Sequence, residues 1–204
     1  MDRIEGILTI VAESLRDKFP DDFYKRCGYA AWAVRALLID EDAEAELVGG
    51  NFVAFVVSPS TGQVGLQGFG YNPSQCAHFW VESMRRIIDL GPYVLPFGSS
   101  FSVLPMPAVA WRMDHSLPKY LRYQTLQRFP SHAVMSPDPI INERCRQFIE
   151  SCRTKWNQNK ARNHFPTWLL SSPAALQRAI NRRDGWARNA LLFERRLALH
   201  ELPF

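Results

Sequence analysis

The sequence predicts an α+β fold, because helical periodicity at the start of the chain gives way to strand-like runs and then returns. Apolar residues recur at helical spacing over residues 4–15, and runs rich in β-branched and aromatic residues follow between residues 45 and 90. Helical patterns with capping residues return after residue 138. We therefore expect two helices, a small antiparallel sheet, and an irregular and helical second half.

Two helices are expected before the sheet. The first carries one apolar stripe and ends at Pro20; the stripe consists of Ile4, Ile7, Leu8, Val11 and Leu15. The second runs from about Cys27 to Ile39 and is apolar on most sides, so we expect it to be largely buried.

The middle of the chain has the composition of strands joined by turns. The predicted strands are Ala45–Gly49, Asn51–Ser58, Ala77–Ser83 and Ile87–Leu90. Met84, Arg85 and Arg86 form a tight connection, which makes the last two strands a hairpin. Residues 59–75 are rich in Gly, Ser and Pro, and we expect them to form a long loop of the kind that often serves function.

The second half begins with a Pro-rich stretch and continues with three predicted helices. Two helices are expected to begin at N-cap and first-turn pairs, Asp138–Pro139 and Ser172–Pro173. Asp184 is the expected cap of a last helix reaching about Leu199. No segment resembles a linker. We expect a single domain over residues 1–204, with a core in 1–107 and a mainly helical half in 108–204 packed on it.

Composition excludes several classes of protein. No stretch approaches the roughly 18 uncharged apolar residues of a membrane helix, and the acidic N-terminus lacks the features of a signal peptide. The four cysteines form no CxxC pair, which disfavours a zinc ribbon. We expect a cytoplasmic protein with reduced cysteines, no cofactor and no membrane partner, although export by a route without such a signal stays open.

Charge is unevenly distributed along the chain, whose net charge is +4. Residues 1–50 hold eleven acidic and six basic residues, whereas residues 144–196 hold three acidic and twelve basic ones. The basic segment combines charge with an aromatic ring in Arg178, Arg182, Arg183, Trp186 and Arg188. An acidic partner is an alternative here; nucleic acid is disfavoured because no nucleic-acid motif appears.

Three residues in separate segments have the chemistry of a thiol active site. Cys27 begins a helix, where the helix dipole and free N–H groups stabilise a thiolate. His78 opens one strand of the predicted hairpin and Asp89 ends the other, so the carboxylate is placed to accept a proton from one imidazole nitrogen. The second nitrogen is then free to face Cys27.

These segments resemble the core of the transglutaminase-like superfamily, which is similar in plan to papain-type cysteine peptidases. The resemblance lies in CGYAAWAVRALL, ELVGGN, HFWVES and IIDL, over roughly residues 27–90. It implies Cys27 as nucleophile, His78 as base and Asp89 as the group that orients the base. It also implies a transglutaminase-like or papain-type cysteine core, to which the predicted helical C-terminal half is an extension outside the resemblance.

The chain departs from the papain pattern at the oxyanion hole, because no glutamine precedes Cys27. Asn51, Gln75 and Trp80 are alternative site-lining residues, and the sequence does not choose among them. A metal site built from Cys27, Cys76, His78 and Asp89 is a further alternative, since zinc accepts these ligands. The other histidines are expected to be structural or at the surface: His115, His132, His164 and His200.

The leading interpretation is a cysteine-dependent hydrolase or acyl transferase that acts on amide bonds through a thioester. A peptidase, a deamidase and a transglutaminase-like enzyme all fit, with a protein or peptide as substrate. One alternative is a catalytically inactive binding protein on the same fold. The other is a binder of nucleic acid or of an acidic partner through the basic segment.

Overall fold

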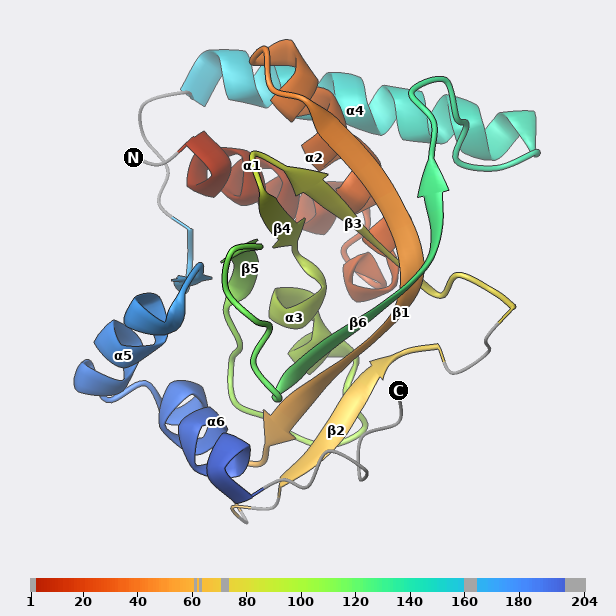
Figure 1. Ribbon diagram of the computed structural model, residues 1–204. Helices are drawn as coiled ribbons and strands as arrows, with labels where there is room; N and C mark the ends of the chain where they lie inside the picture. Colours follow the sequence, from red (N-terminus) through yellow and green to blue (C-terminus); the bar gives the residue numbers. More distant parts are fainter. Residues whose placement is uncertain (1–2, 61, 63, 71–73, 160–164, 197–204) are drawn as a thin grey trace.

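A computed structural model describes residues 3–60, 62, 64–70, 74–159 and 165–196. It shows a mixed α/β fold built on one curled seven-stranded sheet (Figure 1). The strand order is β2-β1-β3-β4-β5-β7, and β6 pairs with the other edge of β1. All pairs are antiparallel except β5 with β7. Among the described helices, none has the length and apolar character needed to cross a membrane.

Between residues 45 and 90, the strands differ from the sequence prediction in two places. Their bounds are β1 Ala45–Val57, β2 Val64–Phe69, β3 His78–Ser83, β4 Arg86–Asp89, β5 Ala108–Arg112, β6 Leu121–Phe129 and β7 Leu169–Leu170. The two strands expected in 45–58 are one continuous strand. The expectation of a loop over 59–75 is wrong for residues 64–69, because β1 supplies a pairing partner that local composition does not reveal.

The predicted helices are present, and the caps explain where they begin. The helical elements are α1 Arg3–Lys18, η1 Phe23–Lys25, α2 Cys27–Asp40, α3 Gly91–Val94, η2 Leu95–Gly98, α4 Pro139–Asn159, α5 Pro173–Asn181 and α6 Gly185–Arg196. Asp138, Ser172 and Asp184 each accept a backbone N–H of the helix that follows. The end expected for the last helix, near residue 199, lies outside the described residues.

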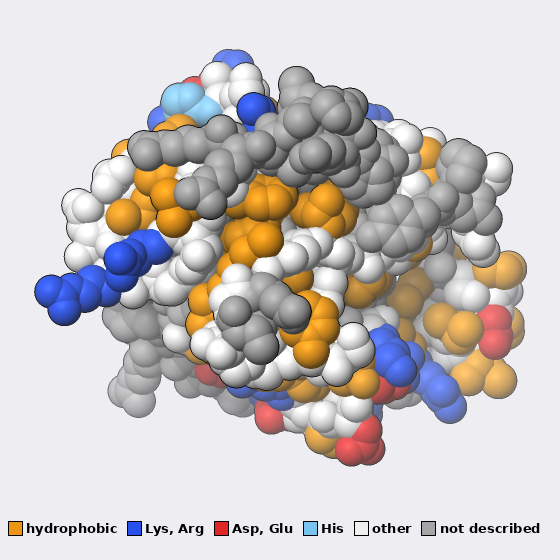
Figure 2. Space-filling view, turned by 90° about the horizontal axis from the view of Figure 1, so that it is seen from below, with side chains coloured by type: hydrophobic (Ala, Val, Ile, Leu, Met, Phe, Trp, Pro, Cys, Tyr) orange, Lys and Arg blue, Asp and Glu red, His pale blue; other side chains and the backbone are white. Residues whose placement is uncertain are grey.

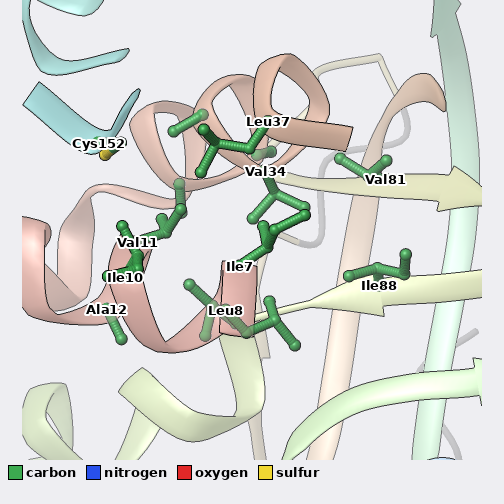
Figure 3. Packing of buried hydrophobic residues seen from close by; sticks show 14 of the residues in the cluster. Ile7, Leu8, Ile10, Val11, Ala12, Val34, Leu37, Val81, Ile88 and Cys152 are labelled. Atoms are coloured by element: carbon green, nitrogen blue, oxygen red, sulfur yellow. The ribbon is translucent and has the colours of Figure 1, made fainter. Parts of the chain in front are cut away.

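The sheet has an apolar core on each face, because successive side chains of a strand point to opposite sides. On one face, Leu47, Val81 and Ile88 pack with α1, α2 and α4. Figure 3 shows Ile7 and Val34 from the two helices converging on Val81 and Ile88. The other face packs against α5 and α6 through side chains that include Val48, Trp80, Ile87, Val109 and Leu176.

The half of the chain expected to be mainly helical also supplies strands of the same sheet. β5 extends the sheet beyond β4, and β6 runs along β1 over Leu47–Ala54. The sheet therefore crosses the boundary that the sequence suggests at residue 107. Both strands pair with partners distant in the chain, so the local pattern alone does not indicate them.

One edge of β1 is shared by two strands, and this arrangement creates room for a site. β3 pairs with residues 45–50 of β1, while β2 pairs with residues 52–57. β2 ends at Phe69 and β3 begins at His78. On the opposite edge, the pairing with β6 shifts register between Gly49 and Gly50. Such irregularities commonly occur beside active sites, where they re-aim side chains.

Candidate active site

Cys27 stands at the first position of α2, where the chain leaves η1. Its side chain is partly exposed, and its Sγ lies 3.9 Å from the carbonyl oxygen of Ala77, just before β3. The guanidinium of Arg26 bonds to Asp22 across η1, with Nε donating to Oδ1 at 3.0 Å. Because the first N–H groups of a helix have no intrahelical acceptor, the start of α2 presents donors and a positive dipole end beside the thiol.

His78 and Asp89 form the buried pair that the hairpin predicts. His78 Nε2 lies 2.8 Å from Asp89 Oδ2, and both side chains are nearly inaccessible to solvent. The hairpin turns through Met84 and Arg85, both of which have left-handed φ values. Its register pairs Val81 with Ile88, which brings Asp89 onto the same face of the sheet as His78.

The second imidazole nitrogen of His78 is not bonded to Asp89, and Cys27 is near enough to act on the ring. Within the described part of the chain, His78 Nδ1 is buried and finds no hydrogen-bond partner. Burial alone lowers the pKa of His78, but the charge and hydrogen bond of Asp89, helped by Cys27, outweigh burial and raise this pKa to about 10. The imidazole therefore carries a proton at neutral pH.

Aromatic rings enclose the imidazole and keep water from it. Phe69 of β2 stacks on His78 at 4.9 Å between ring centroids, with an interplanar angle of 11°. Phe52 of β1 lies 5.1 Å away, and Trp80 of β3 lies 6.2 Å away. These contacts come from three strands, so the plane of the ring is fixed by the split in the sheet.

Asp89 is held by two further donors. The backbone N–H of Gly91 donates to Oδ1 at 2.7 Å, and the hydroxyl of Tyr123 donates to Oδ2 at 2.9 Å. Neither Gly91 nor Tyr123 was among the site residues predicted from the sequence. Gly91 follows Asp89 closely enough for an Asx-type turn to be a usable signal. Tyr123 comes from β6, whose place beside β1 has no local signal.

Replacing Gly91 with alanine is expected to break the His78–Asp89 pair. An added Cβ would lie 2.5 Å from His78 Cε1 and 2.9 Å from Asp89 Oδ2, closer than real Cβ contacts. We expect Gly91→Ala to lower the free energy of unfolding, measured in urea, by about 1–3 kcal/mol. Gly65→Ala is the control, because a Cβ on Gly65 meets no heavy atom within 4 Å. Equal stability of the two variants would contradict this account of the site.

The three alternative lining residues have different positions. Asn51 is buried and donates from Nδ2 to Gln124 Oε1 at 2.9 Å. Trp80 lines the same small pocket as Cys27, but its indole N–H is directed at Glu82 Oε1, 3.5 Å away. Gln75 is exposed. The donor of a side-chain oxyanion hole therefore stays a prediction.

The metal alternative lacks the ligand group that it needs. Among the described residues, no three His, Cys, Asp or Glu side chains are grouped so that they could hold an ion. Burial raises the pKa of Cys145 to about 11 and that of Cys152 to about 12, as suits structural thiols. Burial also raises the pKa of Cys76.

The remaining sequence expectations concern the surface. His115 and His132 are exposed, while His164 and His200 lie outside the described residues. Arg178, Arg182, Arg183 and Arg188 are exposed, but Trp186 is buried and donates to the carbonyl of Phe55 at 2.9 Å. Trp186 therefore cannot stack on a base, which removes the aromatic part of the nucleic-acid alternative.

Comparison with known proteins adds no relative. No protein-family model matches the chain, and neither a curated protein nor a solved structure shows significant similarity to it.

Proposed function

We propose that the protein is a cysteine-dependent hydrolase or acyl transferase that acts on amide bonds. The observation that carries the proposal is the buried His78–Asp89 pair, because Cys27 acts on its imidazole and the second nitrogen has no hydrogen-bond partner among the described residues. A carboxylate, an imidazole and a thiol in this order are the parts of a nucleophilic triad. The same three residues are those that the transglutaminase-like resemblance implies.

The proposed reaction begins with the Cys27 thiolate and the His78 imidazolium. The sulfur attacks the amide carbonyl carbon, and the N–H groups at the start of α2 stabilise the oxyanion that forms. The oxyanion collapses, the C–N bond breaks, and the imidazolium gives its proton to the leaving amine. A thioester remains on Cys27. Water or a second amine then attacks this thioester while His78 accepts the proton of the attacking group.

A groove lined by Phe69, the ring that stacks on His78, is the proposed path for a protein or peptide substrate. It lies between β2 and the turns η1 and η2, and its volume is about 460 Å³. Tyr24 and Lys25 line it from the segment just before Cys27, and Phe69 lines it from β2. Phe69 also stacks on His78, so this ring lies between the groove and the imidazole that must donate the proton.

The end of the molecule that carries β2 and α6 has an apolar surface. Figure 2 views the molecule from below relative to Figure 1. Hydrophobic side chains gather across the middle of this face, with Lys and Arg toward its margins. Val64 of β2, Phe97 of η2 and Leu192 of α6 are among the large exposed apolar side chains. A surface of this kind suits a polypeptide substrate better than a small polar one.

The proposal is tested by alkylating the protein with iodoacetamide across pH and measuring each cysteine by mass spectrometry. We expect Cys27 to be alkylated at neutral pH, because a protonated imidazole and a helix N-terminus beside a thiol favour its reactive form. Cys76, Cys145 and Cys152 are expected to react far more slowly, because burial raises the pKa of each. His78→Ala should abolish the advantage of Cys27.

The opposite result would favour the alternative of an inactive binding protein. In that case Cys27 would react no faster than the other three thiols, and His78→Ala would change nothing. Retention of the protein on heparin, with a steep fall as salt increases, would instead favour binding through the arginines of α5 and α6.

A further inference from the structure

The proposed triad leaves the role of Tyr123 unexplained. This tyrosine belongs to β6, from the half of the chain outside the family resemblance. Its hydroxyl donates to Asp89 Oδ2, the same oxygen that His78 Nε2 contacts. Its ring lies 4.9 Å from Phe52 and 5.1 Å from Trp80, two of the rings that enclose His78.

We propose that Tyr123 is a positioning residue, which sets the strength of the His78–Asp89 pair by sharing one carboxylate oxygen with the imidazole. This inference rests on the proposed function for its catalytic meaning. A hydroxyl donor on Oδ2 disperses part of the carboxylate charge and fixes the direction of that oxygen. Asp89 then attracts the proton on His78 less strongly than a carboxylate without this donor would.

In the proposed reaction, His78 first gives a proton to the leaving amine and later accepts one from the attacking group. An imidazolium bound too tightly to Asp89 is a poor acid for the first of these steps. Tyr123 therefore moderates the acid that Asp89 creates. The hydroxyl remains a donor throughout, because burial, followed by the charge of Asp89, raises the pKa of Tyr123 well above its ordinary value.

The surroundings make the effect specific. The titratable groups that act on His78 are Asp89 of β4 and Cys27 of α2, and Tyr123 responds to Asp89. The other elements around the imidazole contribute apolar rings from β1, β2 and β3, and Gly91 from α3. Removing the hydroxyl of Tyr123 while keeping its ring therefore acts on His78 through the shared oxygen of Asp89.

The test follows the ¹⁵N signals of His78 against pH in protein labelled at histidine, with His78→Ala used for assignment. Tyr123→Phe keeps the ring and removes only the donor. We expect it to raise the pH at which His78 loses its proton by about half to one pH unit. Tyr93→Phe is the matched control, because it removes a hydroxyl that accepts from Arg16, and no shift is expected.

A double-mutant cycle shows whether Tyr123 acts through Asp89. In an Asp89→Asn background, Tyr123→Phe should leave the His78 titration unchanged. An equal shift in both backgrounds, or no shift in either, would overturn the inference. Incorporation of 3-fluorotyrosine at position 123 gives a second variant that keeps the hydroxyl, and its stronger donor should move the titration to lower pH.

These readouts separate this inference from the proposed function. The imidazole signals need neither a substrate nor a reactive thiol, so Tyr123 is tested even where Cys27 proves inert. If Cys27 does react, the upper limb of its alkylation profile should move with Tyr123→Phe by the same amount as the His78 titration. If Tyr123→Phe shifts the His78 titration while Cys27 proves unreactive, the positioning role of Tyr123 stands and the proposed enzymatic function is refuted.

Discussion

Replacing Cys27 with alanine is expected to remove all acyl transfer by the protein. The sulfur of Cys27 is the only atom proposed to bond to the acyl group, and its loss leaves His78 and Asp89 without a nucleophile. From the behaviour of other nucleophilic triads, the rate on an activated 4-nitrophenyl ester or an amide should fall by about 10⁴-fold or more. Intact-mass spectrometry should lose the acyl adduct on the protein at the same time.

The partners of Cys27 give graded controls for this result. His78→Ala should cost nearly as much, because it removes the proton donor for the leaving amine. Asp89→Asn should cost substantially but less, since the one remaining oxygen can still accept from either Gly91 or Tyr123, which bind different oxygens of the carboxylate. Cys76→Ala is the matched control for loss of a thiol. Retained turnover in Cys27→Ala, or an acyl adduct on Cys76, would refute the assigned nucleophile.

The helix and the hairpin of the site were predictable because their signals are local. Cys27 precedes an apolar run that can only be a buried helix, and the helix does begin at Cys27. His78 and Asp89 lie eleven positions apart around a two-residue turn, so strand periodicity alone brings them to one face. Their separation of 2.8 Å is the outcome that this geometry predicts.

The enclosure of the site was not predictable, because it depends on pairing between distant segments. Phe69 belongs to a strand with two glycines, Gly65 and Gly68, whose weak local preference suggests a loop. Tyr123 lies in a nine-residue strand that forms only against β1. In both cases tertiary pairing overrides composition, and it adds the ring that stacks on His78 and the hydroxyl that bonds to Asp89.

The stability of the protein is expected to fall as the pH rises from 6.5 toward 10. The pKa of His78 is about 10 in the folded state and 6.5 for an ordinary histidine. Between these values the folded protein binds a proton that the unfolded chain has released. The stabilisation by His78 is therefore complete below about pH 6.5 and is lost as pH rises through the folded pKa.

The measurement is the free energy of unfolding in urea at pH 6.5 and at pH 8.5. At about 1.4 kcal/mol per pH unit, His78 should account for a loss of about 2–3 kcal/mol over this window. Readings above about pH 9 are avoided, because Cys145 and Cys152 have raised pKa values and there add losses of the same sign.

Asp89→Asn should remove the loss of stability between pH 6.5 and 8.5 that His78 causes. Below pH 6.5 the variant should instead gain stability as the pH rises. Without the carboxylate, burial dominates and moves the pKa of His78 below that of the unfolded chain. The unfolded chain then binds more protons, so the variant should become more stable as the pH rises from 5 to 6.5. A wild-type protein whose stability stays level from pH 6.5 to 8.5 would show that His78 is neutral in the fold. The resting site would then be a thiol beside an imidazole, and activation of Cys27 would have to wait for substrate to bind.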